Sequence, residues 1–180
     1  MNAKDCILQR RSVRRFLPKP IERETVRQIV DLARFAPSWK NSQIVRYTVI
    51  DDKVLKDRIG SDCVRGLTFN TKTIQRAAAL AVISYETGRS GRNDDGSLQS
   101  ADAEKWEMFD AGIATQTFCL AAREFEVGTC ILGVVDESAI HDLLGLPENQ
   151  KVACLVAMGY PEEWKSAPPR RTCEELLSFR

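Results

Sequence analysis

Apolar residues along the chain recur at two different spacings, which predict helices and strands in turn. The clearest helix is expected over 22–35, where four apolar residues fall on one face: Val26, Ile29, Val30 and Ala33. The run 78–85 is apolar apart from Ser84 and has the length of a strand. We expect it inside a sheet that helices cover on both faces.

Shorter patterns predict further elements on either side of these two. Helices are expected at 3–10, with Ile7 and Leu8 turned inward, and at 53–59, with an apolar face made of Val54, Leu55 and Ile59. Asp136 is expected to cap a short helix that contains Ile140, Leu143 and Leu144. Strands are expected at 47–50, 128–135 and 152–158, whereas the stretch 64–76 is ambiguous.

The longest predicted helix covers 101–125 and is nearly all apolar from Ala111 to Ala122. A helix that is apolar all round is buried all round, so we expect this one to be central in the molecule or in a dimer. The Gly-rich stretch 87–100 predicts a mobile surface loop. Prolines begin an extended tail at 160–180 that ends in apolar residues, and we expect this tail to pack on a partner subunit.

Composition and length indicate one ordinary soluble domain over 1–180. The chain has 180 residues, 43% apolar and 28% charged, and a formal net charge of +1. This balance argues against a general nucleic-acid binder. No apolar run approaches the ~20 residues of a membrane span, and the N-terminus does not resemble a secretion signal, so we expect a cytoplasmic protein with no membrane partner.

The side chains offer little chemistry of their own. The six cysteines form no Cys-x-x-Cys pair, and the single histidine, His141, lies in a predicted surface helix. No metal site, no Ser-His-Asp arrangement and no Gly-rich nucleotide loop is expected. We therefore expect no catalytic side chain, and if the protein is an enzyme, a bound cofactor supplies the reaction.

The stretch 10–15 concentrates four arginines in six residues. Arginine grips phosphate with two parallel hydrogen bonds, and Arg10 and Arg14 would share one phosphate if they stood at helical i, i+4 spacing. Ser12 adds a hydroxyl donor. These residues alone fit two interpretations equally well, an anion-binding site and a basic turn exposed to solvent. A cofactor with one anionic end and one flat apolar end, such as flavin mononucleotide (FMN), would suit this cluster and an apolar core.

Four segments together resemble the FMN-dependent nitroreductase family along nearly the whole chain: 10–14, 36–43, 110–122 and 127–133. The resemblance implies an α+β fold, a three-layer α/β/α sandwich with a mostly antiparallel central sheet. It also implies an intertwined homodimer with two FMN sites at the subunit interface.

The resemblance also implies roles for individual residues. The phosphate and ribityl chain would be held by Arg10, Arg11, Ser12 and Arg14, with Arg170 or its neighbour Arg171 reaching the phosphate from the tail. The flavin would be lined from the partner subunit by Pro37, Ser38 and Asn41. Its ring edge would be met by Asn70 and by backbone N–H groups of Leu132 and Gly133. Trp39 would either pack at the dimer interface or form a wall of the substrate pocket.

Two positions depart from the family pattern, since Gln43 is followed by Ile44 rather than proline, and Thr73 stands where many members have lysine. The function implied is an FMN-dependent NAD(P)H oxidoreductase that passes electrons from NADH or NADPH to an electron-poor small molecule such as a nitroaromatic or quinone. Arg89 and Arg92 could meet the 2′-phosphate of NADPH. Two alternatives remain: a non-catalytic flavin- or nucleotide-binding regulatory module, and a reductive dehalogenase or flavin-destroying enzyme on the same fold.

Overall fold

The computed structural model describes residues 1–66 and 68–180. Its helices and strands follow the predicted order, and the ambiguous stretch 64–76 contains a helix. The elements are α1 (Ala3–Gln9), α2 (Arg23–Ala33), η1 (Trp39–Asn41), β1 (Val45–Ile50), α3 (Lys53–Asp62), α4 (Thr68–Arg76), β2 (Ala79–Glu86), α5 (Lys105–Glu124), β3 (Gly128–Leu132), α6 (Glu137–Leu144), β4 (Gln150–Gly159) and α7 (Cys173–Leu176).

The four strands form one antiparallel sheet in the order β1-β2-β4-β3. The largely apolar strand β2 is buried on both faces, as its composition predicts, because helices pack on each side of the sheet at its two inner strands, β2 and β4. Strand β2 lies between β1 and β4, so its backbone groups have hydrogen-bond partners on both sides.

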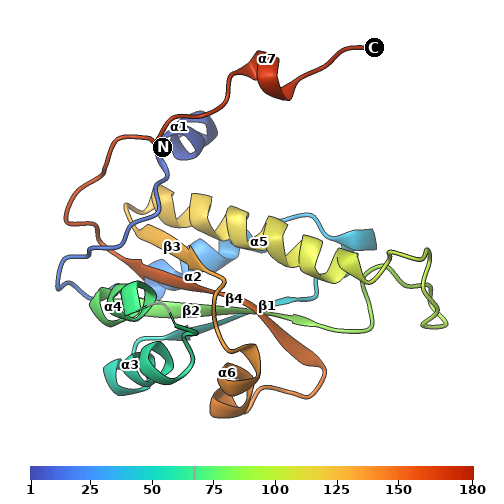
Figure 1. The fold of residues 1–180 in the computed structure, drawn as a ribbon, viewed down its shortest axis with the longest axis horizontal. Coiled ribbons are helices and arrows are strands. Elements are labelled where there is room, and N and C mark those ends of the chain that lie inside the picture. The colour runs from blue at the N-terminus through green and yellow to red at the C-terminus, as the bar shows by residue number, and fades with distance from the viewer. Residues whose placement is uncertain (67) are drawn as a thin grey trace.

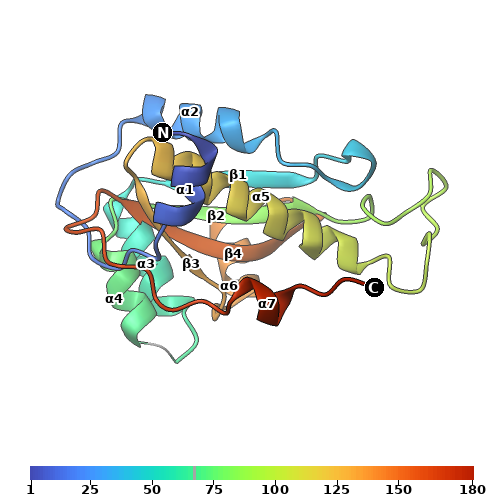
Figure 2. The same cartoon turned by 90° about the horizontal axis from the view of Figure 1, so that it is seen from above.

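Helices cover both faces of the sheet, which confirms the predicted α/β/α sandwich (Figure 1). On one face, α2 and α5 pack against β2 and β4 through Ile29, Phe118 and Val156. On the other face α3, α4 and α6 pack against the same strands through Ile59, Ile74 and Ile140. Figure 2 shows α1 lying across one end of α5, while the C-terminal tail runs along the outside of the molecule.

Several residues predicted to face inward are exposed in the single chain. Ile7 and Leu8 of α1 are 59% and 58% exposed, because Cys6 is the residue that α1 buries. Val54 of α3 is 77% exposed, and the buried positions of that helix are instead Lys56, Ile59 and Gly60. The prediction of these inner faces was therefore wrong at three positions.

The central helix α5 is not buried all round, contrary to the prediction. Its buried side includes Ala111, Phe118 and Ala122, whereas Phe109 and Gly112 on another side are exposed. An apolar composition can cover a helix without a neighbour on every side. Nothing in residues 1–66 and 68–180 covers this exposed side of α5.

The arginine-rich segment lies beside strand β3. Ser12 forms a parallel bridge with Thr129, and the Val13 amide donates to the Thr129 carbonyl at 2.9 Å. A glycine in β3 makes this close approach possible, since a Cβ on Gly128 would stand 2.6 Å from a Val13 methyl and 2.8 Å from Pro161. The segment thus pairs with the edge of β3 through a single isolated bridge.

The tail after β4 has a pinned beginning and an exposed end. The Tyr160 carbonyl accepts from the Leu17 amide at 2.8 Å, and Trp164 packs against the core on the α3 side. Beyond this point, Leu176 and Phe179 are 71% and 88% exposed. No helix within residues 1–66 and 68–180 has both the length and the apolar character that crossing a membrane requires.

Candidate functional site

A cavity of about 430 Å³ opens against the arginine-rich segment. Side chains from three distant parts of the chain line it: the N-terminal segment, helix α4 and the start of the tail. The lining residues are Arg11, Ser12, Val13, Arg14, Arg15, Phe69, Arg76, Glu163 and Lys165. Five of them are cationic and one is a carboxylate, so the cavity favours an anionic ligand.

The arginines of the segment differ in how they are held. Arg11 is used structurally, because its guanidinium donates to the carbonyls of Leu8 at 2.7 Å and Lys165 at 3.2 Å. The guanidinium carbon of Arg14 lies 5.7 Å from the centre of the Phe69 ring. Among the described residues, Arg15 and Arg76 have no side-chain hydrogen-bond or ion-pair partner.

The helical spacing expected for Arg10 and Arg14 is wrong, because α1 ends at Gln9 and the segment is extended. Burial raises the pKa of Cys119, and the charge of Arg10 opposes this rise, while Arg14 acts in the same way on Cys130. These two thiols belong to the cores on opposite faces of the sheet. Of the two arginines, Arg14 lines the cavity and Arg10 does not.

The residues predicted to contact the flavin ring edge lie in α4, next to the cavity, and at the end of β3. Asn70 is half-buried in α4, next to the cavity residue Phe69. Leu132 is the buried last residue of β3, and Gly133 follows it, exposed. A Cβ on Gly133 would meet nothing within 4 Å, so its backbone is open to close approach by a flat ligand.

The tail arginine is not brought to this cavity within the single chain. Arg170 is exposed and donates only to the carbonyls of Pro168 and Pro169, at 3.4 and 3.3 Å. The cationic tail residue that lines the cavity is Lys165. Sequence reasoning missed Lys165 and Arg76, since neither belongs to a charged cluster in the chain.

The predicted flavin-lining loop lies elsewhere in the molecule, over α5. Pro37 and Ser38 line a second cavity of about 230 Å³ that shares no residue with the first. Three non-glycine residues of this loop have left-handed backbone angles: Lys40 with φ 43°, Asn41 with φ 56° and Gln43 with φ 50°. Such angles are strained for side-chain-bearing residues and cluster at functional sites.

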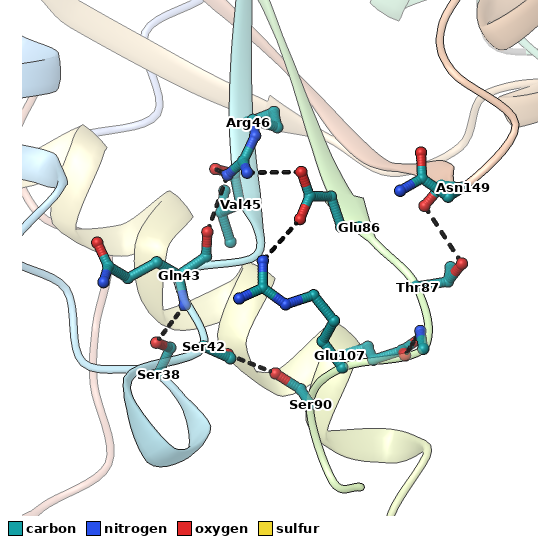
Figure 3. A network of polar contacts seen from close by, with 12 residues as sticks. Ser38, Ser42, Gln43, Val45, Arg46, Glu86, Thr87, Ser90, Glu107 and Asn149 are labelled. Atoms are coloured by element: carbon teal, nitrogen blue, oxygen red, sulfur yellow. Dashed lines mark hydrogen bonds and ion pairs between the residues drawn. The ribbon is translucent and has the colours of Figure 1, made fainter. Parts of the chain in front are cut away.

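Polar contacts hold this strained loop in place, and Figure 3 shows several of them. The Gln43 amide donates to the Ser38 hydroxyl at 3.0 Å, and the Ser42 and Ser90 hydroxyls are 2.7 Å apart. The carboxylate of Asp110 in α5 accepts from the Trp39 amide at 3.1 Å. Ser90 is fully buried, so the prediction of a mobile 87–100 loop is wrong at this position.

Trp39 packs on its own chain. Its ring centre lies 4.7 Å from that of Trp106 at the start of α5, and Trp106 contacts Phe109 edge-on at 5.1 Å. The indole Nε1 of Trp39 is buried without a hydrogen-bond partner among the described residues. These contacts form an aromatic cluster of Trp39, Trp106 and Phe109 beside the strained loop.

The two arginines considered for a 2′-phosphate are engaged in contacts of their own. Arg89 pairs with Glu86 at 2.9 Å, and Glu86 also pairs with Arg46 at 2.5 Å, as Figure 3 shows for the labelled Arg46 and Glu86. Arg92 donates to the Gly96 carbonyl at 2.8 Å and lies 3.8 Å from Glu104. Both arginines therefore stabilise the 86–104 region in the single chain.

The remaining reactive groups form no site of their own. All six cysteines are free, and five are buried, with only Cys173 exposed. His141 lies at the surface of α6, where its Nε2 is 3.1 Å from the Pro147 carbonyl. Within the described ranges, no group of three or more His, Cys, Asp or Glu side chains could hold a metal ion.

Comparisons with known proteins agree with the fold. The family model described as "Nitroreductase family" matches residues 7–160. A candidate NADH dehydrogenase/NAD(P)H nitroreductase of Archaeoglobus fulgidus is 29% identical over 163 residues, covering 88% of this chain and 85% of that protein. An NADPH-flavin oxidoreductase of Vibrio harveyi is 27% identical, covering 94% of this chain and 70% of that protein.

A solved structure shares the whole architecture. The crystal structure of a candidate nitroreductase from Desulfovibrio desulfuricans, in complex with FMN, aligns with a TM-score of 0.81 and 24% identity. The match covers 100% of this chain and 97% of that one. At this identity the likeness shows the fold.

Proposed function

We propose that this chain, which belongs to the nitroreductase family, is an FMN-dependent NAD(P)H oxidoreductase that reduces electron-poor small molecules. The observation that carries the proposal is the cavity against residues 11–15, which combines cationic side chains with an aromatic ring. The FMN of the Desulfovibrio desulfuricans relative and the flavin named for the Vibrio harveyi relative support this choice of ligand.

The residues of this chain fit FMN. Arg14 and Ser12 would hold the phosphate, with Arg10 and Arg11 shaping the segment that presents them. Asn70 and the backbone of Leu132 and Gly133 would contact the ring, where a backbone N–H would stabilise negative charge. When bound, FMN supplies the two-electron carrier that accepts hydride from NADH or NADPH and passes electrons to the acceptor.

Part of the site would come from a second copy of the chain. The loop residues Pro37, Ser38 and Asn41 and the tail residue Arg170 do not reach the cavity of their own chain. In a homodimer they would complete the partner's site. The exposed side of α5 and the exposed apolar residues of the tail are surfaces that such a dimer would bury.

The chain's own contribution would be binding and exclusion of water rather than proton transfer. The cavity contains only one carboxylate, Glu163, and it lies 3.6 Å from the Lys165 ammonium. The aromatic cluster around Trp39 would present an apolar surface to an aromatic acceptor. This arrangement suits acceptors such as nitroaromatics and quinones, which can take the protons that their reduction requires from water rather than from an acidic side chain.

The experiment that tests the proposal is an absorption spectrum of the purified protein, followed by titration with NADH and with NADPH in the absence of air. We expect flavin bands that bleach with one of the two nucleotides and return when a quinone or nitroaromatic is added. A protein that binds no FMN contradicts the proposal. Bound FMN that neither nucleotide reduces would indicate a flavin-binding module without turnover.

Substitution of Arg14 by Ala tests the assigned phosphate contact. Loss of one hydrogen bond to a charged group costs about 1.5–3 kcal/mol, so the dissociation constant for FMN is expected to rise by about 10- to 150-fold. Arg58, an exposed residue of α3 that pairs with Asp62 and lines neither of the two cavities, provides the control substitution Arg58→Ala. An unchanged affinity in Arg14→Ala would remove Arg14 from the site.

A further inference from the structure

Asp110 of α5 is a buried carboxylate that hydrogen bonds satisfy without a cation. Its side chain is 1% exposed, and within the described residues it forms no ion pair. It accepts from the Trp39 amide at 3.1 Å to each oxygen, from the Ser90 hydroxyl at 2.5 Å and from the Ser42 hydroxyl at 3.3 Å. A buried charge is costly unless such donors surround it, so this carboxylate has a specific role in the structure.

The donors come from two segments that meet over α5. Trp39 and Ser42 belong to the loop of residues 36–43, and Ser90 belongs to the 87–100 loop (Figure 3 shows Ser42 and Ser90 facing each other). Each hydroxyl has one proton. The Ser90 hydroxyl donates its hydrogen bond to the Asp110 carboxylate, so the Ser42 hydroxyl donates either to Ser90 or to Asp110.

The loop that Asp110 holds is the strained one. Lys40, Asn41 and Gln43 have left-handed angles that an unsupported loop would relax. Local hydrogen bonds also support it, from the Ser38 hydroxyl within the loop and from Arg46 at the beginning of β1. Asp110 provides the polar link from this loop to α5.

Helix α5 holds Trp39 at two points one turn apart. Trp106 contacts the Trp39 ring, and Asp110, four residues later, accepts from the Trp39 amide. Residues four apart lie on one face of a helix, so both contacts act from the same side. Ring and backbone of Trp39 are thus fixed together, and Asn41 follows two residues later.

We propose that Asp110 is a positioning residue that sets the conformation of the 38–42 loop so that Asn41 and Trp39 meet the flavin of the partner subunit. The proposal rests on the proposed function, because it takes FMN as the ligand. Ser90 and Ser42 extend the same role, since they complete the acceptor shell of the carboxylate. Asp110 would act through this loop, because its carboxylate oxygens accept from Trp39, Ser42 and Ser90.

The first experiment compares Asp110→Ala and Asp110→Asn with the control Glu107→Gln. Glu107 is on the same helix and accepts from the Gly88 amide at 2.7 Å, and among the described residues it forms no hydrogen bond with the 38–42 loop. The apo-proteins are compared by the exciton couplet that the Trp39–Trp106 pair contributes to circular dichroism. Their FMN affinity and bound-flavin absorption spectrum are then measured under conditions in which all variants are folded.

We expect Asp110→Ala to lose the couplet, to shift the flavin spectrum and to bind FMN about tenfold more weakly, which equals about 1.4 kcal/mol. Asp110→Asn should fall between Ala and wild type, because its amide oxygen can still accept from Trp39. Glu107→Gln should match the wild type. A retained couplet in Asp110→Ala, or a lost couplet with unchanged FMN affinity and spectrum, overturns the proposal.

If Asp110→Ala does not fold, the double variant Ser42→Ala/Ser90→Ala replaces it, with the same expected direction and the same contradicting outcomes. A wild-type protein that binds no FMN overturns the proposed function instead. In that case the couplet of the apo-proteins alone decides whether Asp110 sets the loop.

The second experiment tests whether the effect crosses the subunit interface. In a heterodimer of one Arg14→Ala chain and one Asp110→Ala chain, a loop that acts on the partner gives one site with both defects and one intact site. We expect one FMN bound with wild-type affinity per heterodimer. If both sites are weakened, the loop acts within its own chain, and the proposal is wrong.

Discussion

The guanidinium of Arg123 lies over the indole ring of Trp164, and this pair connects the end of α5 to the beginning of the tail. The guanidinium carbon is 4.1 Å from the ring centre, and Arg123 is 5% exposed. It also donates to Glu126 at 2.6 Å and to Gln9 of α1 at 2.9 Å. We predict that Arg123 and Trp164 contribute to stability as a coupled pair.

The magnitude follows from burial. Cation–π contacts are worth about 0.5–1 kcal/mol when exposed and about 2 kcal/mol when desolvated, so we expect an interaction energy of about 1–2 kcal/mol. The single variant Arg123→Met also loses its hydrogen bonds, but the exposed Glu126 and Gln9 side chains regain water. Its free energy of unfolding should therefore fall by about 2–3 kcal/mol.

The assay is a double-mutant cycle of Arg123→Met and Trp164→Leu, with the free energy of unfolding taken from urea titrations. Each kcal/mol should also lower the melting temperature by about 2–4 °C in a chain of this size. The matched control is the exposed pair Arg34 and Phe35, with a distance of 4.6 Å, which should show about 0.5 kcal/mol of interaction or less. If the interaction energy of Arg123 with Trp164 is no larger than that of the control pair, the reasoning is refuted.

Three further predictions concern other parts of the molecule. Lys56→Met should lower the unfolding free energy in urea titrations by about 1–3 kcal/mol, because the buried ammonium donates to two carbonyls at the end of α4. Gly128→Ala should weaken FMN binding and stability together, since its Cβ would stand 2.6 Å from Val13; equilibrium dialysis and thermal unfolding would measure the two effects. The Pro147 carbonyl and then Asp142 raise the pKa of His141 in the folded chain. The protonated histidine therefore contributes fully to the free energy of unfolding below pH about 6.5, and this contribution declines as the pH rises through the folded pKa. His141→Gln should remove that decline, as measured by the free energy of unfolding across neutral pH.

Much of the fold could be predicted from residue spacing, and the failures have physical reasons. The helix expected over 22–35 and the buried strand β2 were predicted correctly, because their patterns are long and regular. The inner face of α3 was wrong because a buried lysine, Lys56, takes a position that its charge would assign to solvent. The exposed side of α5 was missed because apolar composition does not show how many neighbours a helix has.

The candidate site could be predicted only where its residues are close in sequence. Arg11, Ser12 and Arg14 form a visible cluster, and the structure brings all three to the cavity. Arg76 and Lys165 reach the same cavity from α4 and the tail, and nothing in their local sequence indicates it. The spacing argument for Arg10 failed because it assumed a helix where the chain is already extended.

The position of the Arg11–Arg15 segment beside β3 also affects how the protein behaves in concentrated solution. The outer side of β3 would otherwise present unpaired amides and carbonyls, which are a template for joining sheets of different molecules. Ser12 and Val13 occupy part of that side through the Thr129 contacts. Variants that loosen the segment should therefore be checked by light scattering as well as for ligand affinity, because loss of grip on a ligand and a tendency to aggregate would have the same origin.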